Sequence, residues 1–214
     1  MVNVTINNKK ISVPEDTTIL DAAKIAGVSI PTLCYLKELN EIGACRICVV
    51  EVEGVEKLAP ACVTTVKNDM VIRTNSPRVR AARKTNIELI LSEHDCHCTS
   101  CPRSGNCALQ TYANDMIVDE KVYDKNLEST TWDETFPLAK NAANCIKCMR
   151  CIQFCDKVQS LGVWDILNSG ARTTVGVAGG KNIREADCSL CGQCVTHCPV
   201  GALYERSDTD KVFE

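Results

Sequence analysis

Aromatic residues are scarce in this chain. Only 4% of its 214 residues are Phe, Trp or Tyr, which is thin for a single large core. The scarcity favours several small modules, each centred on a cofactor. The hydrophobic fraction of 45% is ordinary, but several of the residues counted in it are cysteines, which a metal would use.

Two kinds of hydrophobic segment are also missing. The opening MVNVTINNKK has no basic segment followed by an apolar run, so it does not resemble a signal peptide. No uninterrupted apolar stretch has the length of a transmembrane helix. We therefore expect a cytoplasmic location without membrane insertion, where the 16 cysteines are spent on metal and not on disulfides.

A surplus of positive charge is absent as well. The chain has 24 basic and 27 acidic residues, a formal net charge of −3, and thiolate-bound clusters would add negative charge. This balance argues against a nucleic-acid partner. A dinucleotide fingerprint is also lacking, because the glycine-rich GVAGG of residues 176–180 has no strand before it and no helix after it. We interpret it as part of a glycine-rich hairpin in an insertion over 159–185.

Cysteine is abundant, and half of the cysteines form a repeat. Residues 144–158, NCIKCMRCIQFCDKV, and 187–201, DCSLCGQCVTHCPVG, each contain the pattern C-x2-C-x2-C-x3-C. In this bacterial iron–sulfur pattern the fourth cysteine of each run ligates the cluster of the other run. It predicts two 4Fe–4S clusters, one held by Cys145, Cys148, Cys151 and Cys198, the other by Cys188, Cys191, Cys194 and Cys155.

Structural zinc and disulfides are the competing interpretations of this repeat. Zinc sites usually pair two C-x2-C units across a gap, whereas three cysteines at a spacing of three suit the corner of a cubane. A zinc-stapled interaction module is therefore the rival from another class of protein. Colour separates the two, because iron–sulfur clusters make a protein brown and zinc leaves it colourless.

The first 76 residues predict a small sheet with one helix. NVTINNKKISV alternates apolar and polar residues, which is typical of a hairpin. Thr17 or Thr18 can cap a helix, Asp21 completes a pattern resembling a capping box, and Gly27 stops the helix. Strands are expected over 47–54, 57–64 and 70–74. Together these elements suggest, by analogy, the β-grasp fold of plant-type ferredoxins.

Four further cysteines lie in this first segment: Cys34, Cys45, Cys48 and Cys62. Small residues beside them, as in GACRIC, would let backbone amides approach sulfur, and such hydrogen bonds tune a cluster's potential. Spacing and expected fold together predict a 2Fe–2S cluster. The alternative is a zinc knuckle.

A helix should begin at Ser76-Pro77 and run to about Ser92, with Val79, Arg83, Ile87 and Ile90 on one side. It leads into HDCHCTSCPRSGNC, where two ligand sets are possible. One is His94, Cys98, Cys101 and Cys107; the other replaces the histidine with Cys96. Spacing alone does not choose between them. A short helix over 106–115 and a connector over 116–140, attached through Trp132 and Phe136, should follow.

The succession C-x10-C-x2-C-x13-C, H-x3-C-x2-C-x5-C and two four-cysteine runs resembles a known region. This is the N-terminal iron–sulfur, electron-relay region of multi-cluster FeFe-hydrogenases, shared with the large iron–sulfur subunit of complex I and related formate dehydrogenases. The resemblance covers essentially the whole chain. It implies that His94, Cys98, Cys101 and Cys107 hold a third 4Fe–4S cluster, which leaves Cys96 outside every ligand set.

Within that group the hydrogenases look most similar, through HCTSCPRSGNCALQ and VGALYERSDTDKVFE. The cysteines that hold their hydrogen-activating cluster have no counterpart in the 214 residues, and nothing resembles a flavin site. The resemblance therefore implies either a separate electron-transfer subunit, like the diaphorase small subunit of NAD-linked hydrogenases, or the front end of a longer enzyme. No catalytic residue is expected within these residues.

The expected architecture is α+β in three parts. These are a 2Fe–2S ferredoxin-type β-grasp domain over 1–76, a His/Cys3 4Fe–4S domain with connector over 77–140, and a 2×(4Fe–4S) ferredoxin-type domain over 141–214. The implied function is a relay of single electrons between a flavin- and NAD(P)-binding subunit or a ferredoxin and a hydrogenase centre of the FeFe type. The alternative is a relay subunit of an NAD(P)-linked formate dehydrogenase or a complex I-like diaphorase.

Overall fold

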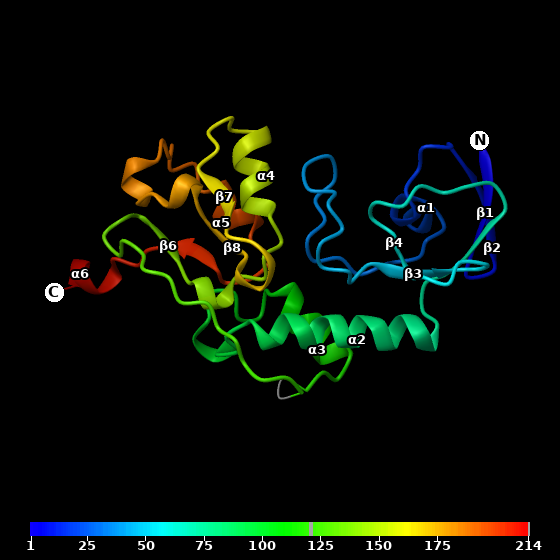
Figure 1. Cartoon of the computed structure of the whole chain (residues 1–214), viewed down its shortest axis with the longest axis horizontal. Helices are drawn as coiled ribbons and strands as arrows, with labels where there is room; N and C mark the ends of the chain where they lie inside the picture. The colour runs from blue at the N-terminus through cyan, green and yellow to red at the C-terminus, as the bar shows by residue number, and fades with distance from the viewer. Residues whose placement is uncertain (120–121, 214) are drawn as a thin grey trace. The chain divides into compact units, whose positions relative to one another are not determined.

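The structure is a computed structural model that describes residues 1–119 and 122–213. Its chain divides into two compact units. The first consists of Met1–Leu89 and Gln110–Asp119, the second of Ile90–Leu109 and the described part of Glu120–Glu214. Helices and small sheets alternate along both, so the α+β class is confirmed (Figure 1). The three predicted domain ranges stay a prediction.

A five-stranded sheet, in the order β2-β1-β5-β3-β4, forms the first unit. Its strands are β1 (Val2–Ile6), β2 (Lys9–Val13), β3 (Val49–Val52), β4 (Ala59–Pro60) and β5 (Met70–Arg73). β1 and β2 make the predicted hairpin, with Asn7 and Asn8 at positive φ in its turn. β1 lies parallel to β5, whereas the other pairs are antiparallel. The strand expected over 57–64 is shortened to the two residues of β4. The chain turns after Pro60, where the Thr64 N–H donates to the Pro60 carbonyl at 3.1 Å.

The helix α1 (Ile19–Ile25) begins at the predicted cap. Thr18 is the N-cap, and its hydroxyl accepts a hydrogen bond from Asp21 N–H at 3.1 Å. Apolar residues of one helix face are buried with the strands in a single core: Ile19, Ala22, Ala23 and Ala26. Gly27, at φ +72°, follows the helix end as predicted.

Two further helices flank the segment that contains His94. α2 (Pro77–Ser92) has the predicted bounds, and the Ser76 hydroxyl accepts from Val79 N–H at 3.3 Å. Val79 and Ile87 are fully buried. α3 (Ala108–Asp115) begins two residues later than predicted, so Cys107 lies just outside it.

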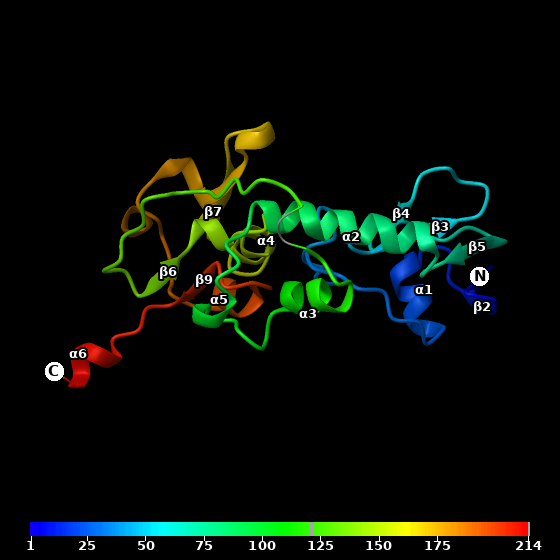
Figure 2. The ribbon, with the colours of Figure 1, turned by 90° about the horizontal axis from the view of Figure 1, so that it is seen from below.

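The second unit is built from short elements around the two cysteine runs. Its main elements are β6 (Leu138–Lys140), α4 (Arg150–Lys157), β7 (Trp164–Leu167), β8 (Thr174–Val177), α5 (Gln193–His197), β9 (Leu203–Glu205) and α6 (Thr209–Phe213). β6 pairs with β9 and β7 with β8, both antiparallel. α4 packs against α5 and β7, and α5 against β9 (Figure 2). The predicted hairpin in the insertion is therefore β7–β8, although its first strand precedes the glycine-rich segment.

Two aromatic side chains attach the predicted connector to the second unit. Trp132 stacks on Trp164, with ring centroids 5.9 Å apart, and donates its indole N–H to the Leu138 carbonyl at 2.8 Å. The Arg184 guanidinium lies 5.9 Å from the ring centroid of Phe136. Residues 120 and 121 of the connector lie outside the described residues. Across 1–119 and 122–213, no helix combines the length and apolar character needed to span a membrane.

Candidate iron–sulfur cluster sites

Loops of the first unit bring four cysteine sulfurs together. Cys45 and Cys48 precede β3, and Cys62 follows β4. The sulfur of Cys48 lies 3.3 Å from that of Cys62, and the thiol of Cys34 is hydrogen-bonded to Cys45. The hydrogen bond with Cys48 and burial raise the pKa of Cys62, and the charges of Cys48, Cys34 and Cys45 add to the shift, so the four predicted 2Fe–2S ligands lie near one another.

The hydrogen bonds in the pairs Cys34–Cys45 and Cys48–Cys62 lower the pKa of one thiol and raise the pKa of the other. The bond from Cys34 lowers the pKa of Cys45 to about 6, and the bond from Cys62 lowers that of Cys48 to about 7. The same bonds, with burial, raise the pKa of Cys34 and Cys62. The backbone N–H of Ile47 also favours the Cys45 thiolate. Since the thiolate is the form that binds metal, the group fits a metal cluster.

A buried cation lies beside this group. Arg83, only 6% exposed, donates from Nη2 to the Val49 carbonyl at 2.8 Å. Burial lowers the pKa of Arg83, while the nearby Cys48 thiolate raises it. The guanidinium therefore offsets part of the negative charge of the site. The sequence placed Arg83 on the correct face of α2, but nothing local indicated that this face meets β3.

The two four-cysteine runs repeat in backbone conformation as well as in sequence. The residue before the second cysteine has positive φ in both runs, 52° at Lys147 and 55° at Leu190. The residue after it does too, 62° at Met149 and 70° at Gly192. Such left-handed positions make tight turns whose N–H groups point inward. Accordingly, Lys147 N–H donates to the Cys145 sulfur at 3.4 Å.

One cavity of the second unit, about 20 Å³, is lined by the first predicted cubane set: Cys145, Cys148, Cys151 and Cys198. Burial raises the pKa of Cys145 to about 11 and that of Cys148 to about 12, and the nearby Cys198 adds to both shifts. Cys198 belongs to the second run but lies in the group of the first.

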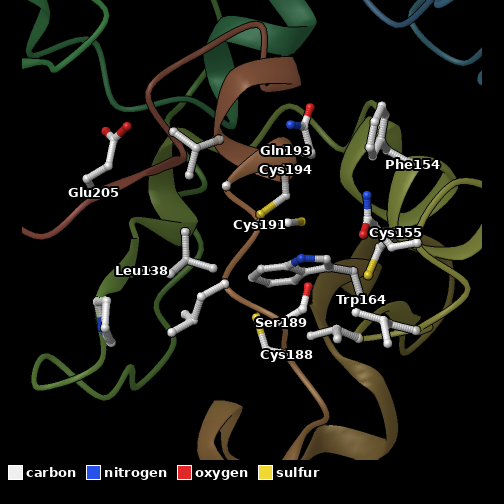
Figure 3. Close-up of a pocket in the computed structure, with 17 residues that line it drawn as sticks. Leu138, Phe154, Cys155, Trp164, Cys188, Ser189, Cys191, Gln193, Cys194 and Glu205 are labelled. Atoms are coloured by element: carbon white, nitrogen blue, oxygen red, sulfur yellow. The ribbon is translucent and has the colours of Figure 1, made fainter.

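A larger cavity, about 170 Å³, is lined by the second predicted set: Cys188, Cys191, Cys194 and Cys155 (Figure 3). Burial raises the pKa of Cys194 to about 11, whereas a hydrogen bond with the Trp164 side chain lowers it. Each run thus contributes its fourth cysteine to the other group, which is the arrangement that crossed ligation requires. Trp164 is a neighbour that sequence reasoning missed at this site.

His94 is held as a metal-binding histidine needs to be. It is 6% exposed, and its Nδ1 lies 3.0 Å from the Asn144 carbonyl. A carbonyl only accepts, so Nδ1 carries the proton and Nε2 keeps a free lone pair. Burial lowers the pKa of His94, which favours the neutral, ligating form. Histidine ligands commonly donate their other ring N–H to a carbonyl in this way.

Cys101 is linked to His94 through two residues that the sequence did not identify. The Asn144 side chain donates to the Gly201 carbonyl at 3.2 Å. A Cβ at Gly201 would lie 2.5 Å from the Cys101 sulfur, so only glycine leaves room for that sulfur. For Cys98 and Cys107, membership in this group rests on their positions in the sequence.

Cys96 faces a different partner. Its sulfur lies 3.0 Å from the Lys125 ammonium, which also donates to the carbonyls of Leu91 at 2.8 Å and His94 at 3.1 Å. Cys96 is therefore in contact with Lys125, which also binds the backbone carbonyl of His94. The ring of His94 is hydrogen-bonded to Asn144 instead. This geometry favours the ligand set that contains His94 over the set that contains Cys96.

The spacing of donors bears on the zinc alternative. A tetrahedral zinc ion needs its sulfur ligands about 2.3 Å from one point. Among residues 1–119 and 122–213, no three or more His, Cys, Asp or Glu side chains are grouped to hold a single metal ion. In the second unit the predicted ligands instead line two cavities, four cysteines to each.

Three families match successive parts of the chain. Residues 1–77 match a 2Fe-2S iron-sulfur cluster binding domain, and residues 83–121 match the NADH-ubiquinone oxidoreductase-G iron-sulfur binding region. Residues 137–204 match the ferredoxin-like domain of NADH-quinone oxidoreductase subunit 3. A 2Fe–2S domain and 4Fe–4S binding regions are therefore present.

Similar proteins include large oxidoreductase subunits. The chain is 43% identical to the NADP-reducing hydrogenase subunit HndD of Solidesulfovibrio fructosivorans, over 100% of this chain and 38% of that protein. It is 35% identical to the NADPH-Fe(3+) oxidoreductase subunit alpha of Geobacter sulfurreducens, over 96% of this chain and 24% of that one. The mitochondrial NADH-ubiquinone oxidoreductase 78 kDa subunit of Candida albicans is 34% identical, with 96% and 28% covered. The chain thus spans well under half the length of these relatives.

A solved structure shares the fold. A chain from the crystal structure of an NAD+-reducing [NiFe]-hydrogenase in the H2-reduced state matches with a TM-score of 0.87 at 24% identity. The match covers 97% of this chain and 88% of that one.

Replacing Gly201 tests the close approach of Cys101. In Gly201→Ala the new Cβ should displace the Cys101 sulfur, so we expect loss of about four iron atoms, one cubane, per chain. Gly162→Ala is the control for an alanine that meets no sulfur: its φ of +59° strains the backbone, but no atom lies within 4 Å of the added Cβ, so iron should be kept. Iron analysis after anaerobic reconstitution measures both. Full iron in Gly201→Ala would contradict this placement.

Variants of His94 and Cys96 decide between the two ligand sets. Cys96→Ser should keep all iron and all electron paramagnetic resonance (EPR) signals, whereas His94→Ala should lose one cubane. His94→Cys should keep that cluster at a lower reduction potential, because an anionic thiolate replaces a neutral imidazole. Loss of a cubane in Cys96→Ser, with none lost in His94→Ala, would reverse the assignment.

Proposed function

The chain belongs to the iron–sulfur family of these hydrogenase and NADH dehydrogenase subunits, and on this premise we propose that it relays single electrons through four clusters. One 2Fe–2S cluster would be held by Cys34, Cys45, Cys48 and Cys62. The observation that carries the proposal is the crossed grouping of eight cysteines in the second unit, four around each of two cavities.

Three 4Fe–4S clusters complete the proposal. Their ligands would be Cys145, Cys148, Cys151 and Cys198; Cys188, Cys191, Cys194 and Cys155; and His94, Cys98, Cys101 and Cys107. Such clusters supply one-electron redox chemistry when bound, and the protein sets their potentials through ligand type, hydrogen bonds and burial. The neutral His94 should give its site a higher potential than an all-cysteine site has.

A short connection supports a relay within the second unit. His94 donates from Nδ1 to the carbonyl of Asn144 at 3.0 Å, and Asn144 is joined by a peptide bond to Cys145. One hydrogen bond and a few covalent bonds therefore link a proposed ligand of one cluster to a proposed ligand of the next. The Asp95 N–H donates to the Ala143 carbonyl at 2.8 Å and holds the two segments together.

The partners are inferred from the family resemblance of the cysteine pattern together with the relatives' names. We infer a flavin- and NAD(P)-binding subunit or a ferredoxin at one end of the relay. At the other end we infer a catalytic domain or subunit of a hydrogenase of the FeFe type, in the same chain or another. The matches to NADH-quinone oxidoreductase regions favour a complex I-like diaphorase as the second candidate, and the resemblance of the cysteine pattern adds a formate dehydrogenase. A cytoplasmic location remains a prediction.

Serine variants test the crossed ligation. Cys198→Ser should abolish the same EPR signal as Cys145→Ser, because both residues would hold one cluster. Cys155→Ser should abolish the same signal as Cys191→Ser. If Cys198→Ser instead removes the signal lost in Cys191→Ser, each run holds its own cluster and the proposed ligand sets are wrong.

The isolated chain tests the function. One 2Fe–2S and three 4Fe–4S clusters require about 14 iron atoms per chain, and the brown protein should bleach with dithionite and then reduce an artificial acceptor. We expect no hydrogen evolution, formate oxidation or NADH oxidation without a partner, since NADH oxidation needs a flavin to split a hydride into single electrons. If iron binding saturates near ten atoms per chain, one of the proposed 4Fe–4S clusters is absent. A colourless zinc protein, or unaided hydrogenase or NADH dehydrogenase activity, would end the proposal.

A further inference from the structure

Trp164 lies between the two cysteine groups of the second unit. It opens β7 in the insertion between the two runs and is 3% exposed. Its indole lines both the cavity of the Cys145 group and the cavity of the Cys194 group. Figure 3 shows the ring among the cysteines of the second cavity, with its nitrogen on the side of Cys194. This single side chain therefore borders both proposed cubane sites.

The hydrogen bond of the indole serves only one of these sites. Tryptophan has one polar hydrogen and accepts no hydrogen bond. In Figure 3 the indole nitrogen lies on the side of Cys194, and its hydrogen bond with that side chain lowers the pKa of the Cys194 thiol. The two four-cysteine runs have the same ligand spacing, but only one of the two cysteine groups has this indole donor.

Neighbouring residues fix the orientation of the ring. Trp132 stacks on Trp164 with an interplanar angle of 9°, and its own N–H is held by the Leu138 carbonyl at 2.8 Å. The backbone of Trp164 pairs with Val177 in the β7–β8 hairpin. Because both the backbone and one ring face are held, the donor stays directed at sulfur.

We propose that Trp164 is a positioning residue that raises the reduction potential of the cluster held by Cys155, Cys188, Cys191 and Cys194. This rests on the proposed function, since it takes that cluster to be present. Reduction adds negative charge to a cluster and its thiolates. An N–H donor to a ligand sulfur stabilises the added charge and so favours the reduced state.

A variant that lacks the Trp164 N–H but keeps an aromatic ring distinguishes an effect of the hydrogen bond on the reduction potential from an effect of side-chain packing. Trp164→Phe retains an aromatic side chain in the wall between the cavities but has no donor. Trp132→Phe is the matched control, because it keeps an aromatic ring stacked on Trp164 and removes only an indole N–H that serves a carbonyl and no sulfur. Replacing Trp164 with benzothienylalanine, in which sulfur stands for the N–H group, keeps the shape of the ring should phenylalanine disturb the fold.

The experiment is a redox titration of the reconstituted full chain followed by EPR. Both phenylalanine variants should bind as much iron as the unmodified protein. In Trp164→Phe one 4Fe–4S signal, the one abolished in Cys191→Ser, should show a ratio of reduced to oxidised cluster about tenfold lower at a fixed potential. That corresponds to a downward shift of about 59 mV for a one-electron couple. Trp132→Phe should leave every potential unchanged.

The possible outcomes distinguish this inference from the proposed function. If the unmodified chain binds no 4Fe–4S clusters, the proposed function fails. If it binds them and neither Trp164→Phe nor the benzothienylalanine protein lowers the potential, the tuning role is wrong. An equal shift in Trp132→Phe would also overturn it, because the effect would then come from packing.

Discussion

Thiolates repel one another, and this protein has to hold them in groups of four, one group in the first unit and two in the second. Burial and three neighbouring cysteines of its own group raise the pKa of Cys151 well above its usual value. A group of this kind is stable as thiolates only when positive charge or N–H donors balance it. Iron supplies that charge, so cluster binding should contribute directly to folding free energy, as it does in other small metal-binding domains. The low aromatic content is consistent with this dependence.

The protein offsets the remaining negative charge of the thiolates in different ways in its two units. In the second unit, left-handed residues such as Lys147 and Met149 turn the backbone so that N–H groups face sulfur. In the first unit, the buried Arg83 adds a full positive charge beside Cys48. A guanidinium also donates to the Val49 carbonyl, so the same side chain ties α2 to β3. Charge balance and packing are therefore provided by the same residues.

Local patterns predicted the parts of the structure that depend on local contacts. The cap at Thr18, the bounds of α2 and the hairpin β1–β2 follow from residues close together in the chain. The cysteine spacing also indicated which sulfurs belong to which group, because a cluster admits few spacings. Spacing could not choose between His94 and Cys96, which are two residues apart. The contacts that favour His94 come from Asn144 and Lys125, 50 and 31 residues away in the sequence.

The residues that were missed share one property: each touches a cysteine group without being a ligand. The cysteine spacing assigns no role to Trp164 or Gly201, because their roles arise only when β7 and the segment before β9 lie beside sulfur. Ligand patterns are repeated within this chain, so ligands alone would give the two cubane sites similar potentials. A difference in potential between two sites biases the direction in which an electron moves, toward the higher potential. Such a difference would come from surroundings that are not repeated, namely the indole beside Cys194 and the hydrogen bond of the His94 ring to the Asn144 carbonyl, next to Cys145.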